Sequence, residues 1–231
     1  MTGRETENWT AANRIPTLIL WDWNGTLLDD VRYAIGVRNR VFPRFGLPTL
    51  EGLEEYHAQF TFPVRQYYER AGVTDANFVQ VANAWMDEYV RGFPTVPLFP
   101  DALPALARFD AAGCVQAVLS ASHVEMLRDQ LAHAGILGRF DEVLGLTHIY
   151  ATSKEAVGRD YLARRAHGSH ACVLLGDTLH DAEVAAALGC RCVLVARGHQ
   201  SRETLETAGV PVCGSLLAAA DLVLGRKTDK V

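Results

Sequence analysis

Three short polar stretches, each at the end of an apolar run, hold the residues best suited to catalysis. The first run ends in Asp22-Trp-Asn-Gly-Thr26 and the second in Ser120-Ala-Ser122. A later run ends in Gly176-Asp177-Thr-Leu-His-Asp181, and Lys154 lies between the last two stretches. Because ligands of open parallel sheets bind at the carboxyl ends of the strands, we expect these residues to meet at one edge.

Together, these residue types predict a phosphoryl-transfer site. Neighbouring carboxylates repel one another unless a cation lies among them, and Mg²⁺ prefers oxygen ligands, few of them from protein. A lysine adds a compact positive charge, and backbone amides of the tight turn Asn24-Gly25-Thr26 can bind phosphate oxygens. An aspartate can act as the nucleophile and form an aspartyl-phosphate that water then hydrolyses. The expected cofactor is therefore Mg²⁺ and the expected partner a small phosphorylated metabolite.

The apolar runs alternate with helical patterns over most of the chain. The expected strands are Thr17–Trp21, Val115–Leu119, Ala171–Leu175 and Cys192–Val195. Apolar strands that alternate with helices indicate a parallel sheet covered by helices on both faces. We therefore predict an α/β fold with a doubly wound, Rossmann-like parallel-sheet core.

The region after the first strand contains no convincing strand. Its breaks at glycine, proline and aspartate predict helices at Val31–Phe45, Leu50–Gln59, Pro63–Ala71 and Asp75–Arg91. The proline-rich linker that ends at Pro100 cannot form a regular helix. The predicted domains are a disordered tail at 1–14, a core at 15–30 and 93–231, and a small helical cap at 31–92.

Several polar residues also fit a purely structural role. Ser122-His-Val-Glu125 has the pattern of a capping box. Asp29-Asp30 and Asp101 precede expected helices and suit N-cap positions. Because an aspartate after a strand is often only a cap or a turn former, the site prediction depends on the whole set rather than on one residue.

Composition excludes several classes of function. The 231 residues carry a net charge of −5, which argues against a nucleic-acid-binding protein. The chain has no apolar run near the roughly 18 residues that a membrane helix needs, and its polar start is unlike a secretory signal. The five cysteines fit buried, reduced thiols in apolar runs. We therefore expect a cytoplasmic protein; nothing in the sequence indicates its oligomeric state.

The order and spacing of the polar stretches resemble the four-motif pattern of the haloacid dehalogenase (HAD) superfamily. That pattern has D-x-D-G-T after a strand, then a strand-end serine or threonine, a lysine, and G-D-x-x-x-D. The resemblance covers about Ile15–Leu224, nearly the whole chain. The helical insert resembles the C1-type cap of phosphoglycolate phosphatase-like members, in its size and in its Gly46-Leu-Pro48 opening. The segment Trp21–Asp30 is typical of one branch of such proteins.

This resemblance implies a metal site. Asp22 would be both the nucleophile and an Mg²⁺ ligand, and the backbone carbonyl of Asn24 would be a second ligand. Asp177 would bind the metal, and Asp181 would support it directly or through water.

The resemblance also implies substrate contacts. Ser120 and Lys154 would hold the transferring phosphoryl group, with Gly25, Thr26 and Ala121 beside it. In the insert, the aromatic segment Phe60–Tyr68 carries Arg65. Either this segment is only the interior of the cap, or Arg65 or an aromatic residue closes over the other end of the substrate, as lids do in such chemistry.

One residue departs from the family pattern. Family phosphatases have an aspartate two residues after the nucleophile, which protonates the leaving oxygen, but here it is Asn24. An amide cannot exchange that proton, and general acid–base help is worth about 10²–10⁴ in rate. A substrate with a good leaving group would need little acid. Alternatively His123 or His180 substitutes, or the protein binds a phosphorylated ligand without turnover and is catalytically weak or inactive.

Two other enzyme classes fit the sequence poorly. A dehalogenase also uses the first aspartate but needs no metal, so the retained Asp177 and Asp181 argue against it. A P-loop kinase needs G-x-x-x-x-G-K-[ST], which the sequence lacks. A phosphatase of the HAD type, a phosphoric monoester hydrolase, is therefore the expected activity.

Overall fold

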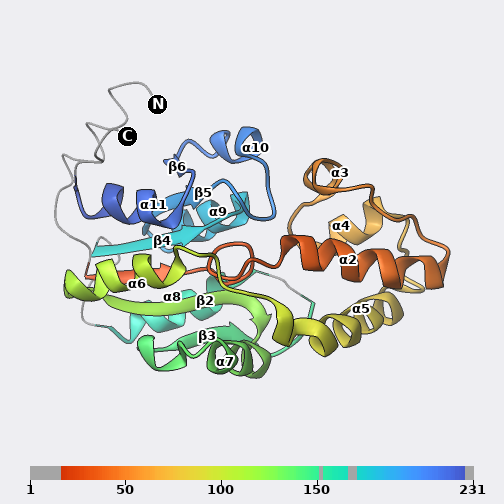
Figure 1. Cartoon of the computed structure of the whole chain (residues 1–231), viewed down its shortest axis with the longest axis horizontal. Coiled ribbons are helices and arrows are strands. Elements are labelled where there is room, and N and C mark those ends of the chain that lie inside the picture. The colour runs from red at the N-terminus through yellow and green to blue at the C-terminus, as the bar shows by residue number, and fades with distance from the viewer. Residues whose placement is uncertain (1–16, 151–152, 166–170, 227–231) are drawn as a thin grey trace.

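Six parallel strands form a single sheet in the order β3-β2-β1-β4-β5-β6 (Figure 1). The computed structural model describes residues 17–150, 153–165 and 171–226, so the predicted tail at 1–14 lies outside the described residues. The strands are β1 Leu18–Trp21, β2 Val115–His123, β3 Val143–Leu146, β4 Cys172–Gly176, β5 Arg191–Val195 and β6 Val212–Cys213. The predicted doubly wound α/β fold is confirmed, with β1 at the point where the strand order reverses.

Helices cover both faces of the sheet because successive strand residues point to opposite sides. Ile19 and Trp21 belong to the larger apolar cluster, whereas Leu18 and Leu20 belong to a second cluster on the other face. Of the helices that flank the sheet, α6 Ala102–Ala111, α7 Val124–His133 and α11 Leu216–Val223 pack into the first cluster. Those packed into the second are α8 Glu155–Ala163, α9 Leu179–Ala187 and α10 Arg202–Glu206.

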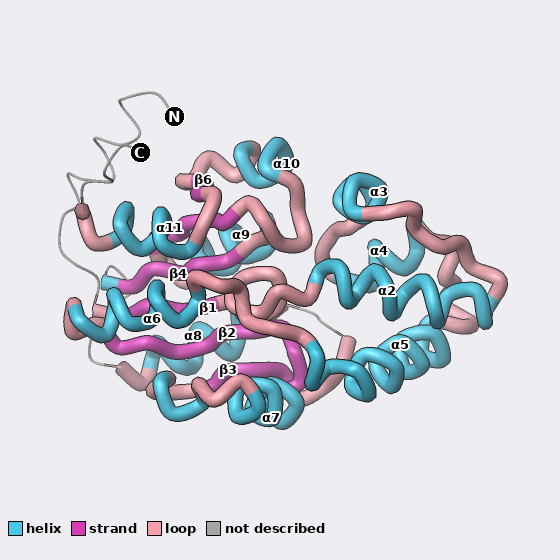
Figure 2. Tube along the Cα trace, viewed as in Figure 1, coloured by secondary structure: helices cyan, strands magenta, loops and turns pink. Residues whose placement is uncertain are grey.

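The remaining long helices form a group beside the carboxyl ends of the strands (Figures 1 and 2). They are α2 Val31–Val41, α3 Leu53–Gln59, α4 Val64–Arg70 and α5 Phe78–Gly92. Short 3-10 turns cover η1 Phe42–Phe45, η2 Phe93–Thr95 and η3 Leu137–Arg139. The four helices α2 to α5 correspond to the predicted insert. The exact boundaries between core and cap remain a prediction. No helix of the described part of the chain has the length and apolar character to cross a bilayer.

Two predicted helix caps differ in the structure. β2 extends to His123, so Ser122 lies in the strand, and α7 begins at Val124 without a side-chain cap. The local S-x-x-E pattern was therefore misleading, because Ser122 binds another partner across the site. Asp101 stands at the start of α6 but caps a different helix, since its carboxylate accepts hydrogen bonds from the backbone N–H groups of Leu216 and Leu217.

Two buried tryptophans fix the segment around the first motif. The indole N–H of Trp21 donates to Gln116 at 2.8 Å, and that of Trp23 donates to Gln130 on α7 at 2.7 Å. Both indoles are fully buried, so each N–H needs a protein acceptor. These bonds hold the backbone on either side of Asp22.

We expect Gln130→Leu to lower the free energy of unfolding by about 1–3 kcal/mol, because it leaves the Trp23 N–H buried without an acceptor. Urea unfolding followed by circular dichroism measures the loss. The control is the same change in a Trp23→Phe background, where no donor is stranded and the loss should be smaller. Equal losses in the two backgrounds would contradict this role of the hydrogen bond.

Candidate functional site

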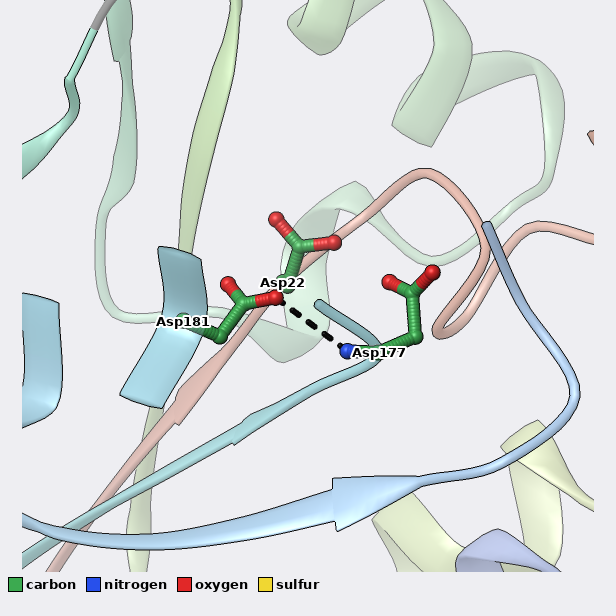
Figure 3. A group of neighbouring side chains, drawn as sticks. All are labelled: Asp22, Asp177 and Asp181. Carbon is green, nitrogen blue, oxygen red and sulfur yellow. Dashed lines mark hydrogen bonds between the residues drawn. The ribbon is translucent and has the colours of Figure 1, made fainter. Parts of the chain in front are cut away.

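Three aspartates converge at the carboxyl ends of β1 and β4 (Figure 3). Asp22 follows β1, Asp177 follows β4, and Asp181 lies in the first turn of α9. All three are buried, and one carboxylate oxygen from each lies within 4.8 Å of the others. Oxygen donors gathered in this way suit a hard divalent cation. The structure thus brings together three of the four residues predicted to bind the metal.

Lys154 lies among these carboxylates, as the sequence predicted. Its side chain is 2% exposed, and its ammonium group forms ion pairs with Asp22 and, at 2.6 Å, with Asp181. Burial alone would lower the pKa of Lys154, but the two carboxylates outweigh it and raise that pKa. Burial raises the pKa of Asp22, with the charges of Asp181 and Asp177 acting in the same direction and Lys154 opposing them. The lysine therefore stays charged and offsets part of the repulsion.

Asp181 is held in place by the start of its own helix. Thr178 and Asp181 form a capping box, and one Asp181 oxygen accepts from the Thr178 hydroxyl at 2.7 Å and from the Thr178 backbone N–H at 2.9 Å. A further bond at 3.2 Å comes from the backbone of Asp177, drawn as the dashed line in Figure 3. The second oxygen remains directed at Lys154.

Asp177 is packed against backbone that only glycine allows. Its carboxylate accepts from the Thr26 hydroxyl at 2.8 Å and from the His199 backbone N–H at 2.6 Å. A Cβ at Gly25 or Gly198 would overlap this carboxylate, and Gly25 also has a φ of +71°. Burial raises the pKa of Asp177 to about 6, with Asp181 adding to the rise and the charge of His199 opposing it.

The predicted phosphate contacts are only partly present. Ser120 and Ala121 line a cavity above the aspartates, together with Lys154. The backbone N–H of Gly25 instead donates to Asp30 at 2.8 Å, and that of Thr26 donates within its own turn. These two amides are therefore not available to phosphate. Thr26 contributes through its hydroxyl, which holds Asp177.

Asn24 has every hydrogen-bonding group of its amide engaged. The amide nitrogen donates to Asp30 at 2.7 Å and to the Tyr89 hydroxyl at 3.0 Å. The amide oxygen accepts from the Ser122 hydroxyl at 2.9 Å. Because Asp30 only accepts, the nitrogen must face it and the oxygen must face Ser122.

Asp30 is the centre of this arrangement, and sequence reasoning assigned it only to a helix cap. It stands at the N-cap position of α2 but makes no capping bond, because its buried carboxylate accepts from Gly25, Asn24 and Tyr89. The His199 ring lies 3.5 Å away. Burial would raise the pKa of Asp30, but hydrogen bonds and the charge of His199 prevail and lower it. The carboxylate beside Asn24 is therefore ionised.

Side chains of the insert also contact two histidines of the core. Tyr56 on α3 hydrogen-bonds the His199 ring at 2.6 Å, and Phe60 stacks on that ring with 5.0 Å between centroids. Phe62 stacks on His180 at 4.2 Å. No sequence motif pointed to His199, Tyr56 or Tyr89, because their partners are distant in the chain.

A cavity of about 170 Å³ extends from the aspartates to the insert. His123 and His180, the two histidines considered as substitutes for the missing acid, both line it. Arg65 does not line it. The Arg65 side chain is 45% exposed and pairs with Glu69 at 3.1 Å and with Asp75. These acidic neighbours hold the guanidinium outside, so its predicted role over the substrate is not supported.

Comparisons with known proteins agree with this geometry. Residues 19–195 match the family model described as haloacid dehalogenase-like hydrolase. The chain is 25% identical to a phosphoglycolate phosphatase of Synechococcus elongatus over 191 residues, 82% of this chain and 88% of that protein. It is 27% identical to the tyrosine-protein kinase PtkA of Mycobacterium tuberculosis over 198 residues, 85% of this chain and 68% of that protein. A predicted phosphatase from Clostridium acetobutylicum shares the fold, with a TM-score of 0.80, 18% identity, and coverage of 92% of this chain and 100% of that one.

We expect Asn24→Asp to lower the melting temperature by several degrees, about 1–3 kcal/mol of stability, because it places a second carboxylate against buried Asp30. Adding Asp30→Asn should recover most of the loss by restoring a carboxylate–amide pair. Differential scanning calorimetry of both single variants and the double variant measures this. A single Asn24→Asp variant as stable as the native protein would contradict the assignment.

Proposed function

Because the chain belongs to the haloacid dehalogenase-like hydrolase family, we propose that it is a Mg²⁺-dependent phosphatase acting on a small phosphorylated metabolite. The observation that carries this proposal is the buried cluster of three carboxylates with one lysine. Its summed charge of about −2 suits a divalent cation next to a phosphate group. The two relatives in the comparison are named as a phosphatase and a kinase, and both kinds of enzyme transfer phosphoryl groups. Their names support phosphoryl transfer but do not indicate whether water or another group accepts the phosphoryl group.

In this proposal Asp22 is the nucleophile. One of its carboxylate oxygens attacks phosphorus while the ester oxygen–phosphorus bond breaks, and the ester oxygen leaves with the bonding electron pair as an alkoxide or phenolate that takes a proton from water. Water then attacks the aspartyl-phosphate, releases phosphate and returns the free carboxylate. Lys154 lies beside the attacking carboxylate and would stabilise the charge of the transferring group, with Ser120 next to it.

Asp22, Asp177 and the backbone carbonyl of Asn24 would hold the magnesium ion. When bound, Mg²⁺ supplies positive charge that offsets the carboxylates and the phosphate oxygens. Asp181 has one oxygen engaged by Thr178 and the other by Lys154. This favours an indirect role for Asp181, in which it orients Lys154 and would contact the metal only through water.

A second candidate function is binding of a phosphorylated ligand without turnover. The observation that favours it is Asn24, which cannot carry a proton and has both amide hydrogens engaged. Such a protein would show Mg²⁺-dependent stabilisation by its ligand and no release of phosphate.

We expect the purified protein to release inorganic phosphate from acetyl phosphate when Mg²⁺ is present, to stop in excess EDTA, and to recover when Mg²⁺ is restored. Asp22→Asn should lower the rate by about 10³-fold or more, because it removes the nucleophile. Acetyl phosphate suits this test since its leaving group, acetate, needs no acid.

The matched control is Asp129→Asn, the same chemical change at an exposed position of α7. It should keep the native rate. Turnover that survives EDTA would contradict the metal requirement. If no phosphate is released, but phosphate with Mg²⁺ raises the melting temperature of the native protein and not of Asp22→Asn, the second function holds instead.

A further inference from the structure

Aromatic side chains form a wall of the cavity, and most of them come from the insert. Phe60, Phe62, Phe78 and Trp85 come from the insert, and Tyr150 comes from the loop after β3. Trp85 stacks on Tyr89 at 4.9 Å, and Phe78 contacts Tyr150 at 5.9 Å. Aromatic rings that face such a cavity favour an apolar ligand, above all one that stacks or meets them edge to face.

This wall offers no partner for a second anionic group of a substrate. Among the described residues that line the cavity, Lys154 is the single lysine and arginine is absent. Lys154 is already paired with Asp22 and Asp181. Arg38 is buried but does not line the cavity, and it donates to the Tyr67 hydroxyl at 2.6 Å. A carboxylate or second phosphate placed here would lose its hydration without gaining a cation, which is costly.

Two of the three histidines that line the cavity, His180 and His199, already face a carboxylate. The His180 ring is stacked against Phe62 with 4.2 Å between centroids, and its Nδ1 lies 3.4 Å from the Glu183 carboxylate. The His199 ring lies 3.5 Å from the Asp30 carboxylate and is covered by Phe60. The aromatic wall of the cavity is thus suited to an uncharged group.

The state of Asn24 restricts the leaving group. Both of its amide hydrogens are directed to Asp30 and Tyr89, so it offers neither a proton nor a hydrogen bond to a departing oxygen. An aliphatic alkoxide, close to hydroxide in basicity, depends strongly on such help. A phenolate does not, because a phenol such as tyrosine ionises with a pKa of about 10.

On the basis of the phosphatase activity proposed above, we propose that the substrate is an aryl phosphate monoester whose uncharged ring lies against Phe60, Trp85 and Tyr150. Its phosphate would lie at Asp22 and Lys154. The Asp22 oxygen–phosphorus bond forms as the aryl oxygen–phosphorus bond breaks, and the phenolate leaves with the electron pair and takes its proton from water. The whole cavity, including the part beside the aspartates, measures about 170 Å³, so the group attached to the phosphate is limited to about a single ring; an apolar cavity of roughly 150 Å³ binds benzene.

The test compares kcat/KM for four substrates in the presence of Mg²⁺. Phenyl phosphate and cyclohexyl phosphate have similar size and apolar character but different leaving groups. Phosphoglycolate carries a carboxylate in place of the ring, and acetyl phosphate needs neither ring nor acid. We expect phenyl phosphate to exceed both cyclohexyl phosphate and phosphoglycolate by about 100-fold or more, given the usual value of an acid catalyst.

A variant at the wall tests the contact with the ring. Trp85→Ala should lower the ratio of kcat/KM for phenyl phosphate to that for acetyl phosphate by about 10- to 100-fold, the usual effect of lost apolar contact. Val79→Ala is the control on the same helix, because Val79 is 50% exposed and outside the cavity. Its ratio should match the native value. Turnover of acetyl phosphate reports that each variant is folded.

The outcomes separate this inference from the phosphatase proposal. If acetyl phosphate is hydrolysed in an Asp22-dependent way but phosphoglycolate or cyclohexyl phosphate matches phenyl phosphate, the inference fails and the phosphatase stands. An unchanged ratio in Trp85→Ala also overturns the placement of the ring. If none of the four substrates is hydrolysed, the phosphatase proposal fails, and the substrate inference fails with it.

Discussion

Mutual repulsion of three buried carboxylates is the constraint on which the site depends. Asp22, Asp177 and Asp181 lie within a few ångströms of one another, where water cannot screen their charges. Lys154 pairs with two of them, and the third, Asp177, accepts from the Thr26 hydroxyl and the His199 backbone. Glycines on either side admit this packing. Even so, the cluster keeps an excess of negative charge, which a divalent cation would offset.

The insert is connected to this cluster by side chains rather than by the chain alone. His199 follows β5 and touches Asp177 through its backbone, while its ring meets Tyr56 and Phe60 of the insert. The insert residue Tyr89 reaches Asp30. The aspartate cluster and the aromatic wall are therefore connected through His199. A change in the position of the insert moves hydrogen-bond partners of the site as well as the aromatic wall.

The sequence predicted the sheet and the motif residues because both follow from local patterns. Apolar runs that end in aspartate identify a strand end, and strand ends of a parallel sheet share one edge. Local patterns failed where a tertiary partner decided the outcome. Ser122 matched a capping box but binds Asn24, and Arg65 suited a substrate contact but is held outside by Glu69 and Asp75. Asp30, Tyr89 and His199 were missed because their partners are brought together only by folding.

The hydrogen bond between Asn24 and Asp30 has an evolutionary consequence. An asparagine codon becomes an aspartate codon by one nucleotide change, so the family's usual residue is always one mutational step away. That step would place two carboxylates 2.7 Å apart in a buried site. Position 30 must therefore change first or together with position 24. The carboxylate at position 30 thus restricts which residues position 24 can hold, and the two positions form one unit of change.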